Sequence, residues 1–152
     1  MIFYQSSDRF FKNNDVFSLE RYSRKTELHF HDAPEFMYIL DGTLEVSLNG
    51  TVFTVGKGDV VSINSTVLHS FKVLSRPLDY YILFANNNFF KSNGLYAENT
   101  FFEPLIRDAE LERIFGEIIA EHELSDDFKN LATISKVISF FVYIIRHHRM
   151  RS

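Results

Sequence analysis

The sequence predicts a mainly β protein, a small β-barrel followed by two α-helices. From Phe17 to about Ala85, runs rich in valine, isoleucine, phenylalanine and tyrosine recur between glycine or asparagine breaks, as in a series of short strands. After the three asparagines at 86–88, the spacing of apolar residues changes to a helical period. The 152 residues are enough for one domain with its own core.

Turn signals divide the strand region into about seven or eight strands. Asp41-Gly42 and Asn49-Gly50 are dipeptides that favour positive φ, and each predicts a tight hairpin. Gly56 to Asp59 predicts a further turn, followed by strands at 60–63, 67–74 and 78–85. The strand between the two hairpins alternates apolar and polar residues, so one of its faces lies in the core.

Residues 36–40 are apolar on both parities, which is typical of a strand covered on both faces. Such a strand needs a layer outside the barrel. The two predicted helices can supply it. The first begins after Asp108, a suitable N-cap, and the second begins near Ser125 to Asp127 and runs to about His148.

The second helix is apolar on almost every side. One seam, spaced as in a coiled coil, consists of Leu131, Ile134, Ile138, Phe141 and Ile145. Because one barrel can cover only one stripe, we expect this seam to form a homodimer interface. The alternative is a monomer in which the first helix, through Phe115 and Ile119, covers the second stripe.

Composition restricts the functional classes. The formal net charge of −4 gives the chain no overall basic field for nucleic acid. The longest strongly apolar stretch, 137–145, is far shorter than the roughly 20 residues of a membrane span, so we expect no membrane association. The absence of cysteine and of a secretory signal favours a cytoplasmic protein. The basic end, 146–151, either complements the helix dipole or leads into a further domain.

One set of residues is a candidate binding site for a metal ion or a small ligand. His29 and His31 lie two apart in a predicted strand and therefore point to the same face, which Glu35 shares by parity. His69 lies on a later strand and joins them only through the fold. Imidazole and carboxylate suit zinc, nickel, manganese or iron, so one interpretation is that the four residues are ligands of a divalent metal. The alternative is a polar cluster that lines a ligand cavity without metal.

The spacing from His29 through His31 and Glu35 to Gly42 resembles the first conserved motif of the cupin superfamily, whose fold is a double-stranded β-helix barrel. A second cupin motif is only partly present. Gly58 and His69 fit it, whereas Asn64, Thr66 and Val73 replace its usual proline, glycine and asparagine.

The wider stretch from about residue 17 to residue 148, which includes the two predicted helices, resembles the N-terminal domain of AraC/XylS-type transcription regulators. The resemblance implies a barrel with an N-terminal arm over residues 1–100, which binds a small effector such as a sugar, and a two-helix dimerisation segment over 101–149. It also implies that DNA is contacted only through C-terminal helix-turn-helix units, for which this chain holds no candidate. On this interpretation the chain is not an enzyme. The alternative is a metal-dependent cupin enzyme, an oxygenase, isomerase or decarboxylase, that uses the same four residues.

Overall fold

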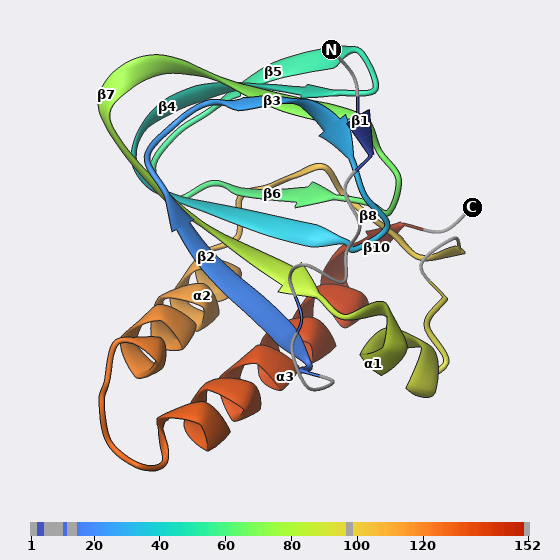
Figure 1. Cartoon of the computed structure of the whole chain (residues 1–152), viewed down its shortest axis with the longest axis vertical. Coiled ribbons are helices and arrows are strands. Elements are labelled where there is room, and N and C mark those ends of the chain that lie inside the picture. The colour runs from blue at the N-terminus through green and yellow to red at the C-terminus, as the bar shows by residue number, and fades with distance from the viewer. Residues whose placement is uncertain (1–2, 5–10, 12–14, 97–98, 151–152) are drawn as a thin grey trace.

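The computed structural model describes residues 3–4, 11, 15–96 and 99–150, and its strands curl into a barrel with helices on one side (Figure 1). An eight-stranded sheet forms the barrel. Its strands are β1 (Phe3–Tyr4), β2 (Phe17–Tyr22), β3 (Thr26–Phe30), β4 (Glu35–Leu48), β5 (Thr51–Val55), β6 (Val60–Ile63), β7 (His69–Ala85) and β9 (Leu105–Ile106). A mainly β fold with C-terminal helices is confirmed.

The barrel closes because β4 and β7 are long, antiparallel to each other and shared by two layers. The first half of β4 pairs with β6 and with the second half of β7, which also pairs with β2. The second half of β4 pairs with β5 and with the first half of β7, which also pairs with β3. Residues from both layers therefore face a common interior.

The two predicted hairpins have different outcomes. Asn49 and Gly50 both have positive φ and join β4 to β5, as expected. The hairpin predicted at Asp41-Gly42 is wrong, because β4 continues through both residues with shifts in its register to β7. Gly42, at φ +81°, forms a bulge that bends the strand from one layer to the other. Similarly, the strands predicted at 67–74 and 78–85 are one bent strand, β7.

The interior is filled by apolar side chains from both layers. Tyr80, Met37, Ile39 and Val61 are completely buried there, and the cluster extends to residues of β5 and the first half of β7. Strand β4 contributes to a second core as well, since Phe36 and Tyr38 point outward. The prediction that 36–40 is covered on both faces is confirmed for Phe36 through Ile39.

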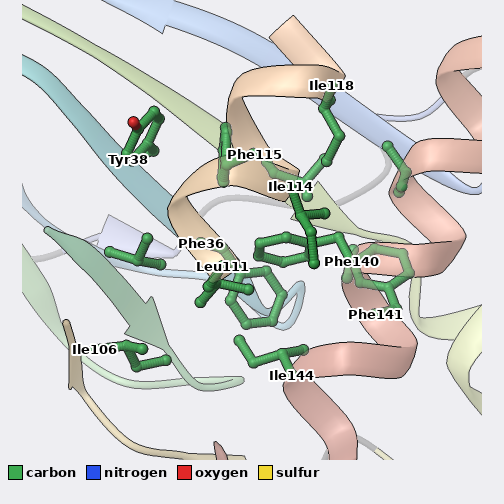
Figure 2. Close-up of a cluster of buried hydrophobic side chains, with 14 of the residues drawn as sticks. Phe36, Tyr38, Ile106, Leu111, Ile114, Phe115, Ile118, Phe140, Phe141 and Ile144 are labelled. Atoms are coloured by element: carbon green, nitrogen blue, oxygen red, sulfur yellow. The ribbon is translucent and has the colours of Figure 1, made fainter. Parts of the chain in front are cut away.

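Helices α2 (Ala109–His122) and α3 (Lys129–His148) cover the outer face of the layer that holds the first half of β4. Phe36 lies 5.4 Å, between ring centroids, from Phe140 of α3, while Tyr38 lies 4.9 Å from Phe115 of α2. Figure 2 shows these rings gathered between the sheet and the helices, with Leu111 and Ile144 beside them. This aromatic layer joins the barrel and the helices in one core.

The helix ends differ in how well the sequence predicts them. Asp108 caps α2 as expected, accepting hydrogen bonds from the N–H groups of Glu110 and Leu111. Helix α3 begins at Lys129, later than the predicted start at Ser125 to Asp127, because Asp126 instead accepts a hydrogen bond from the N–H of Phe128 in the preceding turn. The sequence patterns do not predict α1 (Asn87–Ser92), which Asn86 caps.

The segment that leads into α2 is extended. Strand β9 adds to β6, and β8 (Phe101–Phe102) pairs with β10 (Arg149–Met150), the last two described residues. Segment 101–149 therefore contains short strands as well as its two helices. Among the described residues, no helix is both long and apolar enough to cross a membrane.

The bend at Gly42 gives a stability prediction. A Cβ added there would lie 2.5 Å from the carbonyl oxygen of Pro77, whereas a Cβ at Gly50 would meet nothing within 4 Å. Both glycines have positive φ, so both alanine variants carry a left-handed penalty of about 1–2 kcal/mol. Gly42→Ala should lower the free energy of unfolding by at least about 1 kcal/mol more than Gly50→Ala, measured by urea denaturation. Equal losses would contradict the close packing of β4 on β7.

Candidate metal and effector site

The four predicted site residues come together inside the barrel. His29 is in β3 and His31 directly follows it, whereas Glu35 opens β4 and His69 opens β7. The backbones of His29 and His69 are paired across β3 and β7. All four side chains are buried, with residue exposures between 1% and 6%.

The three imidazole rings surround one point. The ring centroid of His69 lies 4.2 Å from that of His29 and 5.2 Å from that of His31, and the remaining pair is 5.6 Å apart. Glu35 closes the group, with one carboxylate oxygen 3.1 Å from Nε2 of His31 and the other 3.0 Å from Nε2 of His69. The fold thus assembles residues that are up to 40 positions apart in the sequence.

Backbone carbonyls orient two of the rings. Nδ1 of His29 lies 2.7 Å from the carbonyl oxygen of Glu27, and Nδ1 of His69 lies 2.8 Å from that of Val67. A carbonyl can only accept, so each Nδ1 carries a hydrogen and donates it. In the neutral ring this leaves the lone pair on Nε2, the atom available to a metal.

The electrostatics favour an ionised carboxylate among imidazoles. Burial raises the pKa of Glu35, but the charge of His69 and the hydrogen bond with His31 outweigh it and hold that pKa well below its usual range. Burial lowers the pKa of His69, and the neighbouring Glu35 carboxylate more than restores it, so the net direction is upward. Burial and the proximity of His69 lower the pKa of His29. The site therefore holds an ionised carboxylate in contact with imidazole rings.

The residues present fit a divalent metal ion. One ligand atom from each of the three histidines lies within 4.8 Å of the others. Nε2 of His69 and the nearer oxygen of Glu35 are both buried, yet they form no well-directed hydrogen bond. A metal ion between them would satisfy both atoms. His29, His31 and His69 would hold the ion, with Glu35 as the fourth ligand or as their hydrogen-bond partner. The ion would act as a Lewis acid or would stabilise the fold.

Two aromatic walls complete the site and were not singled out in the sequence. Phe84 lies 5.8 Å from His31, and Phe71 lies 5.8 Å from His69, both measured between ring centroids. Phe71 shares the parity of His69 on β7, so alternation along that strand could have identified it. Phe84 faces Glu35 across β4 and β7, a pairing that depends on the register of the folded sheet.

Two residues of the predicted N-terminal arm, which form β1, pair with the strand that carries His29. Phe3 and Tyr4 pair in parallel with His29 and Phe30 of β3, and the rings of Tyr4 and Phe30 lie 5.3 Å apart. Residues 1–2, 5–10 and 12–14 of the arm lie outside the described residues.

The residues predicted for a dimer interface separate into two groups. Leu131 and Ile138 are 69% and 38% exposed, and Ile134 and Ile145 are half-buried. Phe141 is 2% exposed, because it packs against Phe36 and Phe90 within the same chain. Its assignment to an exposed seam is therefore wrong. Val142, 41% exposed, completes the exposed stripe instead.

Residues 16–84, which span β2 to nearly the end of β7, match the family model described as "Cupin domain". The fold is that of a cupin. No curated protein sequence matches the chain.

One solved structure, similar over most of the chain, agrees with this fold. The chain is similar to apo ToxT K231A from Vibrio cholerae, with 17% identity and a TM-score of 0.60 over 89% of this chain and 58% of that one. It therefore spans little more than half the length of ToxT. The Schizosaccharomyces pombe Cnp3 cupin domain has 21% identity and a TM-score of 0.45 over 56% of this chain and 67% of that one. Bacillus subtilis oxalate decarboxylase W96Y has 18% identity and a TM-score of 0.44 over 56% and 30%.

The geometry of the cupin site predicts metal binding that can be measured directly. Zn²⁺ or Mn²⁺ at about a hundredfold above its dissociation constant should stabilise the chain by about 2.7 kcal/mol, which raises Tm by roughly 5–10 °C. Elemental analysis after dialysis should find near-stoichiometric metal. His31→Ala should strongly reduce both effects, because it removes one of the three imidazole ligands.

His122→Ala is the matched control, since His122 lies at the end of α2, away from the barrel interior. It should keep the metal and the shift in Tm. Unchanged metal content in His31→Ala would show that the ion binds elsewhere.

Proposed function

We propose that this chain is the effector-sensing and dimerisation part of an AraC-type transcription regulator. A small molecule or a metal ion binds at the histidine cluster in the barrel. Binding alters the packing of helices α2 and α3 against a second subunit. It thereby changes the position of a DNA-binding part that lies outside this chain. DNA contact belongs to that other part, in keeping with the net charge of −4.

The observation that carries this proposal is the position of the helices relative to the site. Glu35 and Phe36 are neighbours on β4, so they point to opposite faces of the sheet. Glu35 contacts His31 and His69 inside, while Phe36 contacts Phe140 of α3 outside. A change at the cluster therefore reaches the helices across a single strand. Sensing requires only that the ligand bind one arrangement of these parts better than the other.

The likeness to ToxT supports the proposal at the level of the fold. ToxT is an AraC-family regulator, and the similarity covers 89% of this chain. That share requires residues beyond the barrel strands, which end at Ile106 in β9. The similarity to ToxT therefore includes part of the helical segment that follows the barrel.

The exposed stripe on α3 supports a homodimer. Leu131, Ile138 and Val142 follow one another along the helix at spacings of seven and four residues and are exposed, so they lie on one face. Apolar residues that line up on an exposed helix face are typical of an interface. Ile138 and Val142 border a shallow groove of about 310 Å³ between α2 and α3, which is also lined by Ile114 and Tyr143.

The charges at the two ends of α3 favour an antiparallel pairing of the two copies. Asp126 and Asp127 precede the helix, and Arg146 and Arg149 lie at its end. A two-fold axis across the middle of the stripe, near Ile138, places the acidic end of one copy beside the basic end of the other. A parallel arrangement would instead bring like charges together.

Ile138→Asp tests the dimer. Burying an unpaired carboxylate at the centre of a self-contacting stripe costs several kcal/mol, so the dimer dissociation constant should rise at least about a hundredfold. Sedimentation velocity over a range of concentrations measures this change. Val52→Asp makes the same substitution on β5, at a side chain that is 54% exposed, and should leave the dimer intact. A wild-type chain that remains monomeric at high micromolar concentration would contradict the proposed interface.

The histidine cluster also supports a second candidate function. Three histidines and a carboxylate that fit a metal ion are the ligand set of a metal-dependent cupin enzyme, an oxygenase, isomerase or decarboxylase. The exposed apolar stripe on α3 favours the regulator, because a reaction inside the barrel does not need it whereas an interface with a second copy does. Turnover of a small organic substrate by the metal-loaded chain would favour the enzyme.

A further inference from the structure

A second cluster of titratable groups lies outside the barrel, where α3 ends. It joins three parts of the chain: Glu103 between β8 and β9, Asp108 before α2, and Tyr143 and His148 in the last turns of α3. None of these residues contributes to the histidine site or to the apolar stripe of α3.

His148 is held from both sides of its ring. Nδ1 lies 2.8 Å from a carboxylate oxygen of Glu103, and Nε2 lies 2.7 Å from Oδ2 of Asp108. An ionised carboxylate only accepts hydrogen bonds, so both nitrogens must donate at once. Only the protonated imidazolium can do this. A neutral ring would direct a lone pair at one of the two carboxylates.

Asp108 links the two helices through its two oxygens. Oδ1 accepts from the N–H groups of Glu110 and Leu111 at the start of α2. Oδ2 accepts from Nε2 of His148 and, at 2.7 Å, from the hydroxyl of Tyr143. The start of α2 and the end of α3 are thereby fixed to one carboxylate.

The backbone continues the same connection. The carbonyl of His148 accepts from the N–H of Glu103 at 3.1 Å, and the next two residues form β10 against β8. Loss of the contact between the His148 and Glu103 side chains would therefore loosen the start of the β10–β8 pair. The direction in which the chain leaves α3 depends on this pair.

We propose that Glu103, Asp108, Tyr143 and His148 form a proton-controlled latch, closed when His148 is protonated, that fixes the end of α3 and strand β10 to the segment that joins the barrel to α2. The proposal rests on this geometry alone and holds for either candidate function. For a regulator, the latch sets the orientation of whatever follows β10.

The groups that face His148 define the pH range of the latch. Burial lowers the pKa of His148, but the hydrogen bonds with Glu103 and Asp108 outweigh it and raise that pKa above its ordinary value. Burial raises the pKa of Asp108, while His148, Tyr143 and the N–H groups of α2 lower it to about 2. Asp108 in turn raises the pKa of Tyr143 to about 12.

These directions give the latch two limits. Because the His148 pKa is raised in the closed state, the stabilisation is complete below the ordinary histidine pKa and is lost as pH rises through the raised value. Because the Asp108 pKa is lowered, its share persists above the ordinary aspartate pKa and is lost only as pH falls toward about 2. The upper limit lies above the ordinary histidine pKa.

Amide hydrogen exchange of the peptide that covers residues 144–150, corrected for the intrinsic effect of pH, measures the latch. From about pH 6 to 9, wild-type protection should fall by up to tenfold per pH unit across the range between the ordinary and raised pKa values, with a one-proton slope. His148→Arg carries a permanent charge and can donate to both carboxylates, so its protection should stay high and flat. His148→Gln cannot be protonated and should show low, flat protection.

His147→Gln is the matched control, because His147 is the neighbouring exposed histidine; its ring lies tilted beside that of Tyr143, with centroids 4.4 Å apart. It should retain the wild-type profile. Wild-type protection that does not change with pH, or a wild-type profile in His148→Gln, would overturn the proposal. If His148→Arg does not fit the site, the comparison of wild type with His148→Gln still decides the outcome.

Discussion

The alternation of Glu35 and Phe36 at the start of β4 is the constraint on which the rest of the structure depends. Glu35 is buried between His31 and His69 inside the barrel, where its charge is compensated by imidazole. Phe36, the next residue, is completely buried outside the barrel against Phe140 and Phe102. A one-residue slip of β4 would expose the charge to the aromatic layer and the ring to the polar site. The two cores therefore specify one register together.

This shared register gives the molecule a short route from the barrel to its surface. The helices are held on the sheet mainly by aromatic packing, and polar contacts are added at the edges, such as Tyr81 to Glu123 at 3.1 Å. Close-packed layers do not deform continuously, so a small shift of β4 favours a discrete change in helix position. The exposed stripe of α3 lies on the far side of the same helix, where the proposed homodimer would form.

The sequence predicts the fold class and the four site residues because both depend on local patterns. Strand parity places His29 and His31 on one face, and the cupin-like spacing adds Glu35 and His69.

The incorrect predictions occur where tertiary contacts determine the local structure. Gly42 has the positive φ expected of a hairpin, but packing of β4 on β7 uses it for a bulge. Phe141 fits a coiled-coil seam by spacing, yet Phe90 of α1, a helix that the sequence patterns do not predict, and Phe36 bury it. The latch joins His148 to Glu103 and Asp108, which lie 45 and 40 positions earlier in the sequence, so no local pattern predicts it.

Hydrogen exchange with and without Zn²⁺ tests the central claim, that the histidine site and the helix layer form one cooperative unit through β4. Metal at the cluster should slow exchange in β3, β4 and β7, where the ligands lie. The account predicts that amides of α2 and α3 near Phe115 and Phe140 become protected in the same titration, with the same midpoint, because these rings pack on Tyr38 and Phe36 of β4. Protection confined to the strands around the histidines, with unchanged exchange in both helices at saturating metal, would contradict it.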